Sequence, residues 1–277
     1  MRRQAIRRRP RRGELAPDLA AAFPEQLDPE QVRDVETKIG PVYVHAADEI
    51  MTPYIASQRQ WEPAEMEFMR SRVRAGHTVL DVGANIGWFS LFGAALVGPR
   101  GRVIAVEPER RNLSLLRANL WRNGCVQVSV LPIAAGSRRG FIGLQRNELN
   151  RGDHQVGLER EPVHDLVPMA RLDELLAGVR LDFVKVDTQG FDHEVIAGLS
   201  GCLAAGEPTI LSEFWPAGLA RRDVDALAVA EGYRAMGLSI ELLDDAGAVA
   251  PASPSEIVQA ALSHPDGYRN VVLRRGA

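Results

Sequence analysis

The feature that most constrains the fold is a regular alternation, from residue 77 onward, of short β-branched runs with helical stretches. The strand-like runs lie at 78–82, 102–108, 126–134, 181–187, 208–215 and 268–275. Helices are expected between them, at 86–98, 110–124, 192–206 and 253–262. This alternation predicts βαβ units and a mainly parallel sheet covered by helices. Right-handed crossovers then bring the carboxyl ends of the strands to one edge, where ligands bind.

The chain divides into three parts. Residues 1–15 are expected to form a disordered basic tail, because "MRRQAIRRRPRR" holds seven arginines and no acid. Residues 16–76 read as a cap: 13–40 is weakly helical, 40–46 is a short strand and 62–73 has helical spacing after Pro63. Residues 77–277 form the ligand-binding domain, with an irregular insert at about 136–180 that contains the strand-like "GFIGLQ".

Composition argues against several classes of protein. Cys125 and Cys202 form no CxxC or Cys/His cluster, which favours reduced thiols in a cytoplasmic protein and gives no zinc site. No apolar run approaches the roughly 18 to 20 residues that a membrane span needs. Behind its basic tail the chain is acidic, a poor match for nucleic-acid phosphates. We therefore expect a small-molecule or glycan partner.

The turn after the first strand of this domain reads "DVGANIG" and indicates the cofactor. Gly83 and Gly87 allow backbone angles closed to other residues, and the helix that follows favours anions at its N-terminus. The turn does not match the GxGxxG of dinucleotide sites, and Asp81 would repel a pyrophosphate. S-adenosylmethionine has no phosphate: Asp81 can bind its amine and the turn amides its carboxylate.

Glu107 gives a second signal, because it ends the next strand 20 residues after Gly87. That spacing places a carboxylate where it can accept hydrogen bonds from both ribose hydroxyls. Asp81, the glycine turn and Glu107 together predict a site for S-adenosylmethionine.

Several motifs carry a family resemblance. The segments "VLDVGANIGWFS", "VIAVEPERRNLSLLRANL", "DFVKVDTQGFDHEVIAGL" and "NVVLRR" resemble the FkbM family of S-adenosylmethionine-dependent methyltransferases, over roughly residues 40 to 275. The resemblance implies a class I methyltransferase fold, a Rossmann-like α/β sandwich with a seven-stranded, mostly parallel sheet of order 3-2-1-4-5-7-6 and an antiparallel last strand. It also implies methylation of oxygen, often on sugar or secondary-metabolite hydroxyls.

The resemblance further implies which residues bind the cofactor. By motif position these are Asp81, Gly83, Ala84, Asn85, Gly87 and Glu107, with Asn112 and Ala134 beside the adenosine. The chain departs from the family pattern at Thr188, which is usually apolar, and at Gln189, where a glutamate is usual. A role for a carboxylate at position 189 is therefore not expected here.

The strand at 181–187 supplies the catalytic candidates. Alternation directs Lys185 and Asp187 to the same face, and Asp187 ends the strand. Methyl transfer is an in-line displacement governed by positioning, and a hydroxyl acceptor also loses a proton. We expect Asp187 to orient or deprotonate the acceptor; alternatively it holds the methionine end of the cofactor or caps the next helix. Lys185, one of two lysines in the chain, is interpreted as an ion-pair partner rather than a base.

Other side chains compete for roles at the site. His154, in the polar loop 146–155, is the main rival base, followed by His193. Glu213 is a candidate for lining the acceptor pocket and Trp61 for covering the methionine arm. No tight acidic pair appears, so no metal is assigned.

Three other functions remain open from sequence. One is N-methylation of a small molecule or of a nucleic-acid base, although "DTQGFD" lacks the prolines of a base-stacking turn. The others are an NAD-dependent oxidoreductase and a non-catalytic S-adenosylmethionine-binding protein. Residues 1–76 and 136–180 are expected to build the acceptor pocket. No motif in these segments indicates which acceptor binds there.

Overall fold

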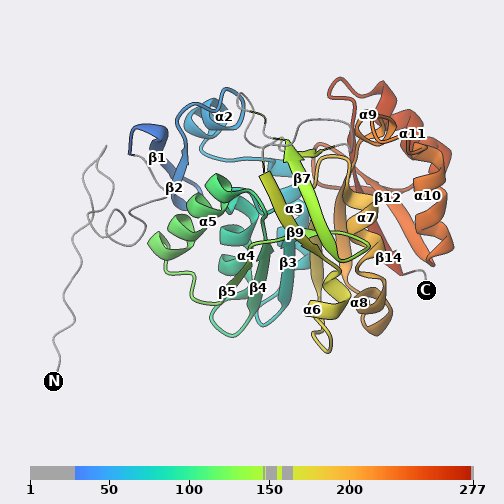
Figure 1. The fold of residues 1–277 in the computed structure, drawn as a ribbon, viewed down its shortest axis with the longest axis horizontal. Helices are drawn as coiled ribbons and strands as arrows, with labels where there is room; N and C mark the ends of the chain where they lie inside the picture. The colour runs from blue at the N-terminus through green and yellow to red at the C-terminus, as the bar shows by residue number, and fades with distance from the viewer. Residues whose placement is uncertain (1–28, 146, 148–154, 158–164, 276–277) are drawn as a thin grey trace.

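The computed structural model describes residues 29–145, 147, 155–157 and 165–275. Its centre is an eight-stranded sheet, shown in Figure 1. In spatial order its strands are β5 (Val128–Leu131), β4 (Arg102–Val106), β3 (Thr78–Val82), β10 (Phe183–Val186), β11 (Thr209–Phe214), β14 (Arg269–Arg275), β12 (Leu238–Leu243) and β13 (Val249–Pro251). The predicted order 3-2-1-4-5-7-6 is confirmed, with β14 antiparallel to both neighbours. The edge strand β13 is an eighth strand that the sequence analysis did not predict.

Helices cover both faces of this sheet because strand residues alternate between two cores. Val79 and Phe183 pack with α3 (Pro63–Arg72), α4 (Trp88–Val97) and α5 (Arg110–Arg122). Their neighbours Leu80 and Val184 pack on the other face. The helices of that second face are α6 (Leu172–Leu175), α7 (Asp192–Ala197), α8 (Ser200–Ala205), α9 (Pro216–Ala220), α10 (Ala226–Ala235) and α11 (Pro254–Ser263). Figure 1 shows the two groups on opposite sides of the strands.

The helix predicted over 192–206 is two helices, α7 and α8, which is a correction. The break falls at Gly198, which packs against the insert: a Cβ there would lie 2.0 Å from the carbonyl oxygen of Gly136. A tertiary contact therefore interrupts a stretch whose local pattern favours one helix.

The N-terminal part of the described chain also differs from its prediction. The weak helix expected over 13–40 is wrong for its described part, where Pro29–Gln31 is one 3-10 turn and β1 (Val32–Thr37) is a strand. β1 pairs along its whole length with β2 (Gly40–His45), and α2 (Met51–Gln58) follows. Buried Asn119 of α5 holds this hairpin, accepting from the Tyr43 amide at 2.7 Å and donating to the carbonyls of Tyr43 and Ile86.

The insert forms a small separate sheet. Its strands, in the order β6-β9-β7-β8, are β6 (Ala134–Ala135), β9 (Asp165–Ala170), β7 (Gly140–Gln145) and β8 (Gln155–Val156). β7 coincides with the predicted "GFIGLQ" strand. The predicted tail at 1–15 and the loop residue His154 lie outside the described residues. Among the helices that the structure describes, none is long and apolar enough to cross a membrane.

Candidate active site

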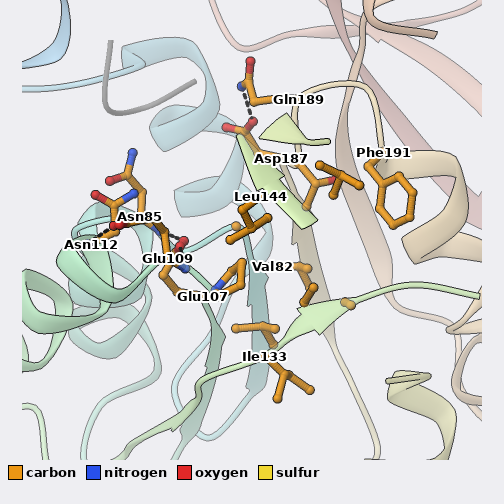
Figure 2. A pocket seen from close by; sticks show the side chains of 17 residues that line it. Val82, Asn85, Glu107, Glu109, Asn112, Ile133, Leu144, Asp187, Gln189 and Phe191 are labelled. Carbon is orange, nitrogen blue, oxygen red and sulfur yellow. Dashed lines mark hydrogen bonds between the residues drawn. The ribbon is translucent and has the colours of Figure 1, made fainter. Parts of the chain in front are cut away.

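A narrow cavity opens at the carboxyl ends of β3, β4 and β10, and we call it the strand-end cavity. Figure 2 shows its two ends: Asn85, Glu107, Glu109 and Asn112 gather on one side, and Asp187 and Gln189 on the other. The rest of the lining is largely apolar and includes Val82, Val106, Ile133, Leu144, Val156 and Phe191. Apolar walls with a few polar groups at fixed places are typical of sites for small molecules and cofactors.

The glycine turn allows β3 and β10 to approach each other at this cavity. Gly83 has φ 80°, and its amide and that of Ala84 both donate to the carbonyl of Val106 at 3.0 Å. Gly87 has φ 93° and begins α4, and a Cβ there would lie 2.6 Å from Leu116 Cδ1. Both positions therefore favour glycine for conformation, and Gly83 also for space, because a Cβ there would meet the backbone of Asp187.

Glu107 is the buried acid of the cavity, with 5% of its surface exposed. Its carboxylate accepts from the amides of Asn85 and Glu109, each at 2.8 Å. Burial raises the pKa of Glu107 to about 8 despite these two hydrogen bonds. The next turn is equally fixed: Glu109 caps α5 by accepting from the Asn112 amide, and His45 Nε2 lies 2.7 Å from Asn112 Oδ1. The structure thus holds Glu107 and Asn112 rigidly at one end of the cavity.

Five of the eight predicted cofactor residues line the strand-end cavity: Gly83, Asn85, Glu107, Asn112 and Ala134. Ala84 and Gly87 shape the turn from behind and do not line it. Asp81 is 1% exposed and also lies outside the lining; its Oδ2 accepts from Ser90 Oγ at 2.6 Å. Burial raises the pKa of Asp81 as well. Its other oxygen, Oδ1, is buried with no hydrogen-bond partner among the described residues.

The described part of the insert covers the strand-end cavity. Leu144 of β7 and Val156 of β8 complete the wall, and Figure 2 shows Leu144 above the strand ends. The free space is about 60 Å³, whereas ligand pockets generally measure roughly 300 to 1,000 Å³. A nucleoside therefore requires part of the cavity wall to move outward. Sequence reasoning missed Leu144 and Val156, because short strands in an irregular insert carry no ligand pattern.

A second, larger cavity adjoins the first, and we call it the acidic cavity. It has a volume of about 720 Å³. Its walls come from residues 50–65 and from 213, 243–245 and 264–270, and none of its lining residues belongs to the described part of the insert. The expectation that 1–76 and 136–180 build the acceptor pocket stays a prediction, and the described segment 50–65 and the C-terminal segment 243–270 line this cavity.

Three residues line both cavities: Asn85, Asp187 and Gln189. Two of them, Asn85 with φ 51° and Gln189 with φ 54°, hold left-handed backbone conformations that are unfavourable for side chains other than glycine. Glu62, which lines the acidic cavity, has φ 44°. Such strained residues cluster at functional sites. The junction of the two cavities is therefore the point at which chemistry between two ligands is possible.

Asp187 stands at this junction, held by two neighbours. Lys185 Nζ donates to Asp187 Oδ2 at 2.8 Å, and Gln189 Nε2 donates to Asp187 Oδ1 at 2.8 Å. A glutamate at 189 could not donate this hydrogen bond when ionised, so the departure from the family pattern orients Asp187 instead of adding a charge beside it. The predicted shared face of Lys185 and Asp187 is confirmed by their contact.

Lys185 is a buried cation, 5% exposed. Its ammonium lies 3.9 Å from Glu62 Oε2 and 4.4 Å from the centroid of the Phe89 ring. Burial alone would lower the pKa of Lys185, but the carboxylates of Asp187 and Glu62 outweigh it and raise that pKa. Lys185 is thus protonated at neutral pH, which agrees with its interpretation as an ion-pair partner.

More carboxyl groups surround the junction. Glu65 of α3 accepts from the side-chain amide of Asn270, and Glu213 of β11 has a buried oxygen, Oε2, without a hydrogen-bond partner among the described residues. Burial raises the pKa of Glu65, and burial with nearby Asp187 raises that of Glu213 well above its usual range. Glu213 lines the acidic cavity, which agrees with its candidate role as a residue that lines a second pocket. Trp61 lines this cavity too, edge-on to Tyr54 at 5.4 Å.

The rival bases are less well placed or lie outside the description. His154 belongs to the undescribed loop. His193 of α7 lines neither cavity, and burial lowers its pKa. The described residues include no group of three or more His, Cys, Asp or Glu side chains arranged to hold a metal ion.

The protein thus has a Rossmann-like fold with two joined cavities at the carboxyl ends of its strands, the place where ligands bind in such folds. The model of the Methyltransferase FkbM domain matches residues 81–230, more than half of the chain. The protein therefore belongs to the FkbM methyltransferase family, and its cofactor is S-adenosylmethionine. A comparison with curated proteins gave no significant match.

Solved structures of methyltransferases resemble the chain more distantly. An FkbM methyltransferase from Methylobacillus flagellatus is 17% identical, with 76% of this chain and 50% of that one covered and a TM-score of 0.44. A precorrin-6y C5,15-methyltransferase from Geobacter metallireducens is 15% identical, with 77% and 89% covered and a TM-score of 0.45. A SAM-dependent methyltransferase from Aquifex aeolicus is 14% identical, with 76% and 88% covered and a TM-score of 0.43. The family assignment rests on the match over residues 81–230.

Proposed function

We propose that the protein transfers a methyl group from S-adenosylmethionine in the strand-end cavity to a hydroxyl oxygen of a small-molecule or glycan acceptor in the acidic cavity. The observation that carries this proposal is the sharing of Asn85, Asp187 and Gln189 by the two cavities. A methyl group that leaves one ligand for another must cross such a junction, because in-line displacement keeps donor, carbon and acceptor on one line.

In this proposal Glu107 accepts from the ribose hydroxyls, and Asn112 and Ala134 lie beside the adenosine. The amino end of the cofactor lies near the glycine turn. Two buried oxygens, Asp81 Oδ1 and Asn85 Oδ1, have no hydrogen-bond partner among the described residues. A buried acceptor without a donor costs free energy, and the ammonium of the cofactor is a donor that would relieve that cost, directly or through water.

The bound cofactor supplies an electrophilic methyl group on a sulfonium. The protein's part is to present the acceptor oxygen and remove its proton. Asp187 is the group proposed for this, since it directly follows β10 at the junction and its carboxylate has further lone pairs beside those used by Lys185 and Gln189. Lys185 and Gln189 act as positioning residues, because each donates a hydrogen bond to one oxygen of the Asp187 carboxylate.

The test is incubation of the protein with S-adenosylmethionine carrying a deuterated methyl group and an extract of metabolites, followed by mass spectrometry. A product that carries the label on oxygen supports the proposal. A label on nitrogen would reassign the acceptor atom. Binding of S-adenosylhomocysteine without any labelled product would indicate a non-catalytic binding protein, the alternative that the altered "KVDTQG" segment leaves open.

A further inference from the structure

We infer that the acceptor carries a protonated amine in addition to the hydroxyl that is methylated, and that the carboxyl groups of the acidic cavity bind this amine. The inference rests on the proposed function, because it takes the acidic cavity as the acceptor site. It assigns the acceptor to a chemical class, that of hydroxylated amines such as amino sugars and amino alcohols.

The first support is the balance of charge around the junction. Four carboxyl groups line the inner part of the acidic cavity: Glu62, Glu65, Asp187 and Glu213. Lys185 lies near all four, bound to Asp187 and 3.9 Å from Glu62. One lysine therefore faces four carboxyl groups, and no cation among the described residues forms an ion pair with Glu65 or Glu213. A cationic group of the ligand would supply the missing positive charge.

The outer part of the acidic cavity also carries mainly negative charge. Asp244, Asp245 and Asp266 line it, with Arg269 as the strongly basic residue among the described lining. The Arg269 guanidinium is itself engaged, lying 3.4 Å from Asp245 Oδ1 and donating to the carbonyl of Leu243. The charges of this outer part are thus mainly negative among the described residues, which favours entry of a cation over an anion.

The second support is a buried acceptor without a donor. Glu213 Oε2 has no hydrogen-bond partner among the described residues, although it is shielded from solvent. Its neighbour in the wall, Glu65, is fixed in place by Asn270. An ammonium group has three N–H donors, which is enough to reach Glu213 and a second carboxylate at once. A neutral hydroxyl offers one donor and no charge.

The third support is the aromatic wall. Tyr54, Trp61 and Tyr268 line the same cavity, and Tyr54 and Trp61 meet edge to face. Aromatic faces attract ammonium groups and also pack on the carbon skeleton of a sugar or amino alcohol. Carboxylates and aromatic rings on one wall are a combination that selects organic cations over anions.

The pKa values of the carboxyl groups in the acidic cavity agree with an acceptor that carries an amine. Burial raises the pKa of Glu62 to about 8, and burial likewise raises the pKa of Glu65 and Glu213. These groups thus tend to hold protons while no cation is bound, and an arriving ammonium lets them ionise. Glutamine resembles the protonated form in shape and hydrogen bonding, so Glu→Gln variants are expected to keep the fold while losing the ability to ionise.

The methyl group is still transferred to the hydroxyl oxygen of the acceptor and not to its amine. An amine held as ammonium has no lone pair and cannot attack the methyl carbon. The acceptor hydroxyl forms the new O–C bond while the S–C bond of the cofactor breaks and its electron pair stays on sulfur. The hydroxyl proton passes to Asp187 and then to solvent, and the cofactor leaves as S-adenosylhomocysteine.

The test separates labelled products by charge. The full-length protein, deuteromethyl S-adenosylmethionine and a metabolite extract are incubated, and cation-exchange chromatography is coupled to mass spectrometry. We expect the labelled product to be retained as a cation, and to lose that retention after acetylation of its amine. A labelled product that elutes as a neutral or anionic compound would overturn the inference but not the proposed function. Absence of any labelled product would overturn both.

Two variants, Glu65→Gln and Glu213→Gln, test whether these carboxyl groups bind the amine of the acceptor. Each is expected to slow product formation at limiting acceptor by roughly tenfold or more, the effect of one lost hydrogen bond to a charged group. Affinity for S-adenosylhomocysteine, measured by calorimetry, should stay unchanged and reports that the variant is folded. Glu231→Gln is the matched control, since Glu231 is exposed on α10 and lines neither cavity. A folded Glu213→Gln enzyme with full activity at limiting acceptor would contradict the inference.

Discussion

Gly83 packs directly against the backbone of Asp187: a Cβ at residue 83 would lie 1.8 Å from the Asp187 carbonyl oxygen. The amide of Asp187 in turn donates to the carbonyl of Val82 at 3.0 Å. The turn proposed to bind the cofactor and the carboxylate proposed to act on the acceptor are therefore one rigid unit, although they are far apart in the sequence.

Gly83→Ala is expected to separate β3 from β10 at this point. The new methyl group overlaps a backbone atom that cannot rotate away, and the φ of 80° adds strain. We expect a lower melting temperature and a loss of S-adenosylhomocysteine binding of roughly tenfold or more, measured by thermal unfolding and calorimetry. Gly76→Ala is the control, with φ 87° and no atom within 4 Å of the new Cβ. Equal effects of the two substitutions would show that conformation alone, and not the contact with Asp187, matters.

Glu107→Gln is expected to weaken cofactor binding by roughly 1 to 3 kcal/mol, the range for hydrogen bonds to a charged group. The amide keeps the shape of the side chain but accepts through one oxygen, so it cannot hold both backbone amides and the ribose together. Calorimetry with S-adenosylhomocysteine measures the change. Unchanged affinity in a folded variant would mean that the ribose lies elsewhere.

The substitution Asp187→Asn tests whether Asp187 is the general base of methyl transfer. If Asp187 accepts the proton of the acceptor, turnover should fall by roughly 10² to 10⁴, the usual contribution of general base catalysis. Cofactor affinity should stay within a few-fold, because the shape and most hydrogen bonds remain. If Asp187 instead holds the methionine end of the cofactor, affinity will fall together with rate.

His154→Ala is the paired variant for this experiment, because His154 is the main rival base. We expect it to keep most of its turnover when measured with the same acceptor over a range of pH. An inactive His154→Ala enzyme that still binds cofactor, beside a fully active Asp187→Asn enzyme, would show that the loop histidine is the base.

The buried acids give the protein an unusual dependence of stability on pH. The pKa values of Glu62 and Glu107 rise to about 8 in the folded state, and burial raises that of Asp192 to about 7. Between about pH 4.5 and 8 the unfolded chain has lost these protons while the folded protein keeps them. The folded state then binds more protons, so the free energy of unfolding falls as pH rises through this window.

Glu62→Gln is expected to flatten that dependence, because glutamine does not titrate. Denaturant unfolding at pH values across the window measures it, with a change of roughly 1 to 3 kcal/mol in the pH-dependent part. Glu231→Gln, an exposed position, should leave the slope as in the wild type. A wild-type protein whose stability rises across the window would contradict the raised pKa values.

Local pattern was enough to predict most of the sheet. Strands such as 78–82 and 181–187 are apolar and β-branched, and short turns with glycine separate them from amphipathic helices. These signals are encoded within a few residues, whereas the order of the strands was expected from the family resemblance. The glycine turn and Glu107 were predictable for the same reason, because motif spacing places them at neighbouring strand ends.

Tertiary structure decided the rest. β1 became a strand because β2 offers it a complete pairing partner, and the helix over 192–206 broke because Gly198 meets Gly136. Likewise Glu62 and Glu65 lie at the start of α3 and Glu213 lies on β11, and no spacing in the sequence relates them to Lys185. The sequence by itself determined the family, the cofactor and the sheet, whose signals are local. Only the folded chain determined the acidic cavity, because long-range packing alone brings its carboxyl groups together and raises their pKa values by burial.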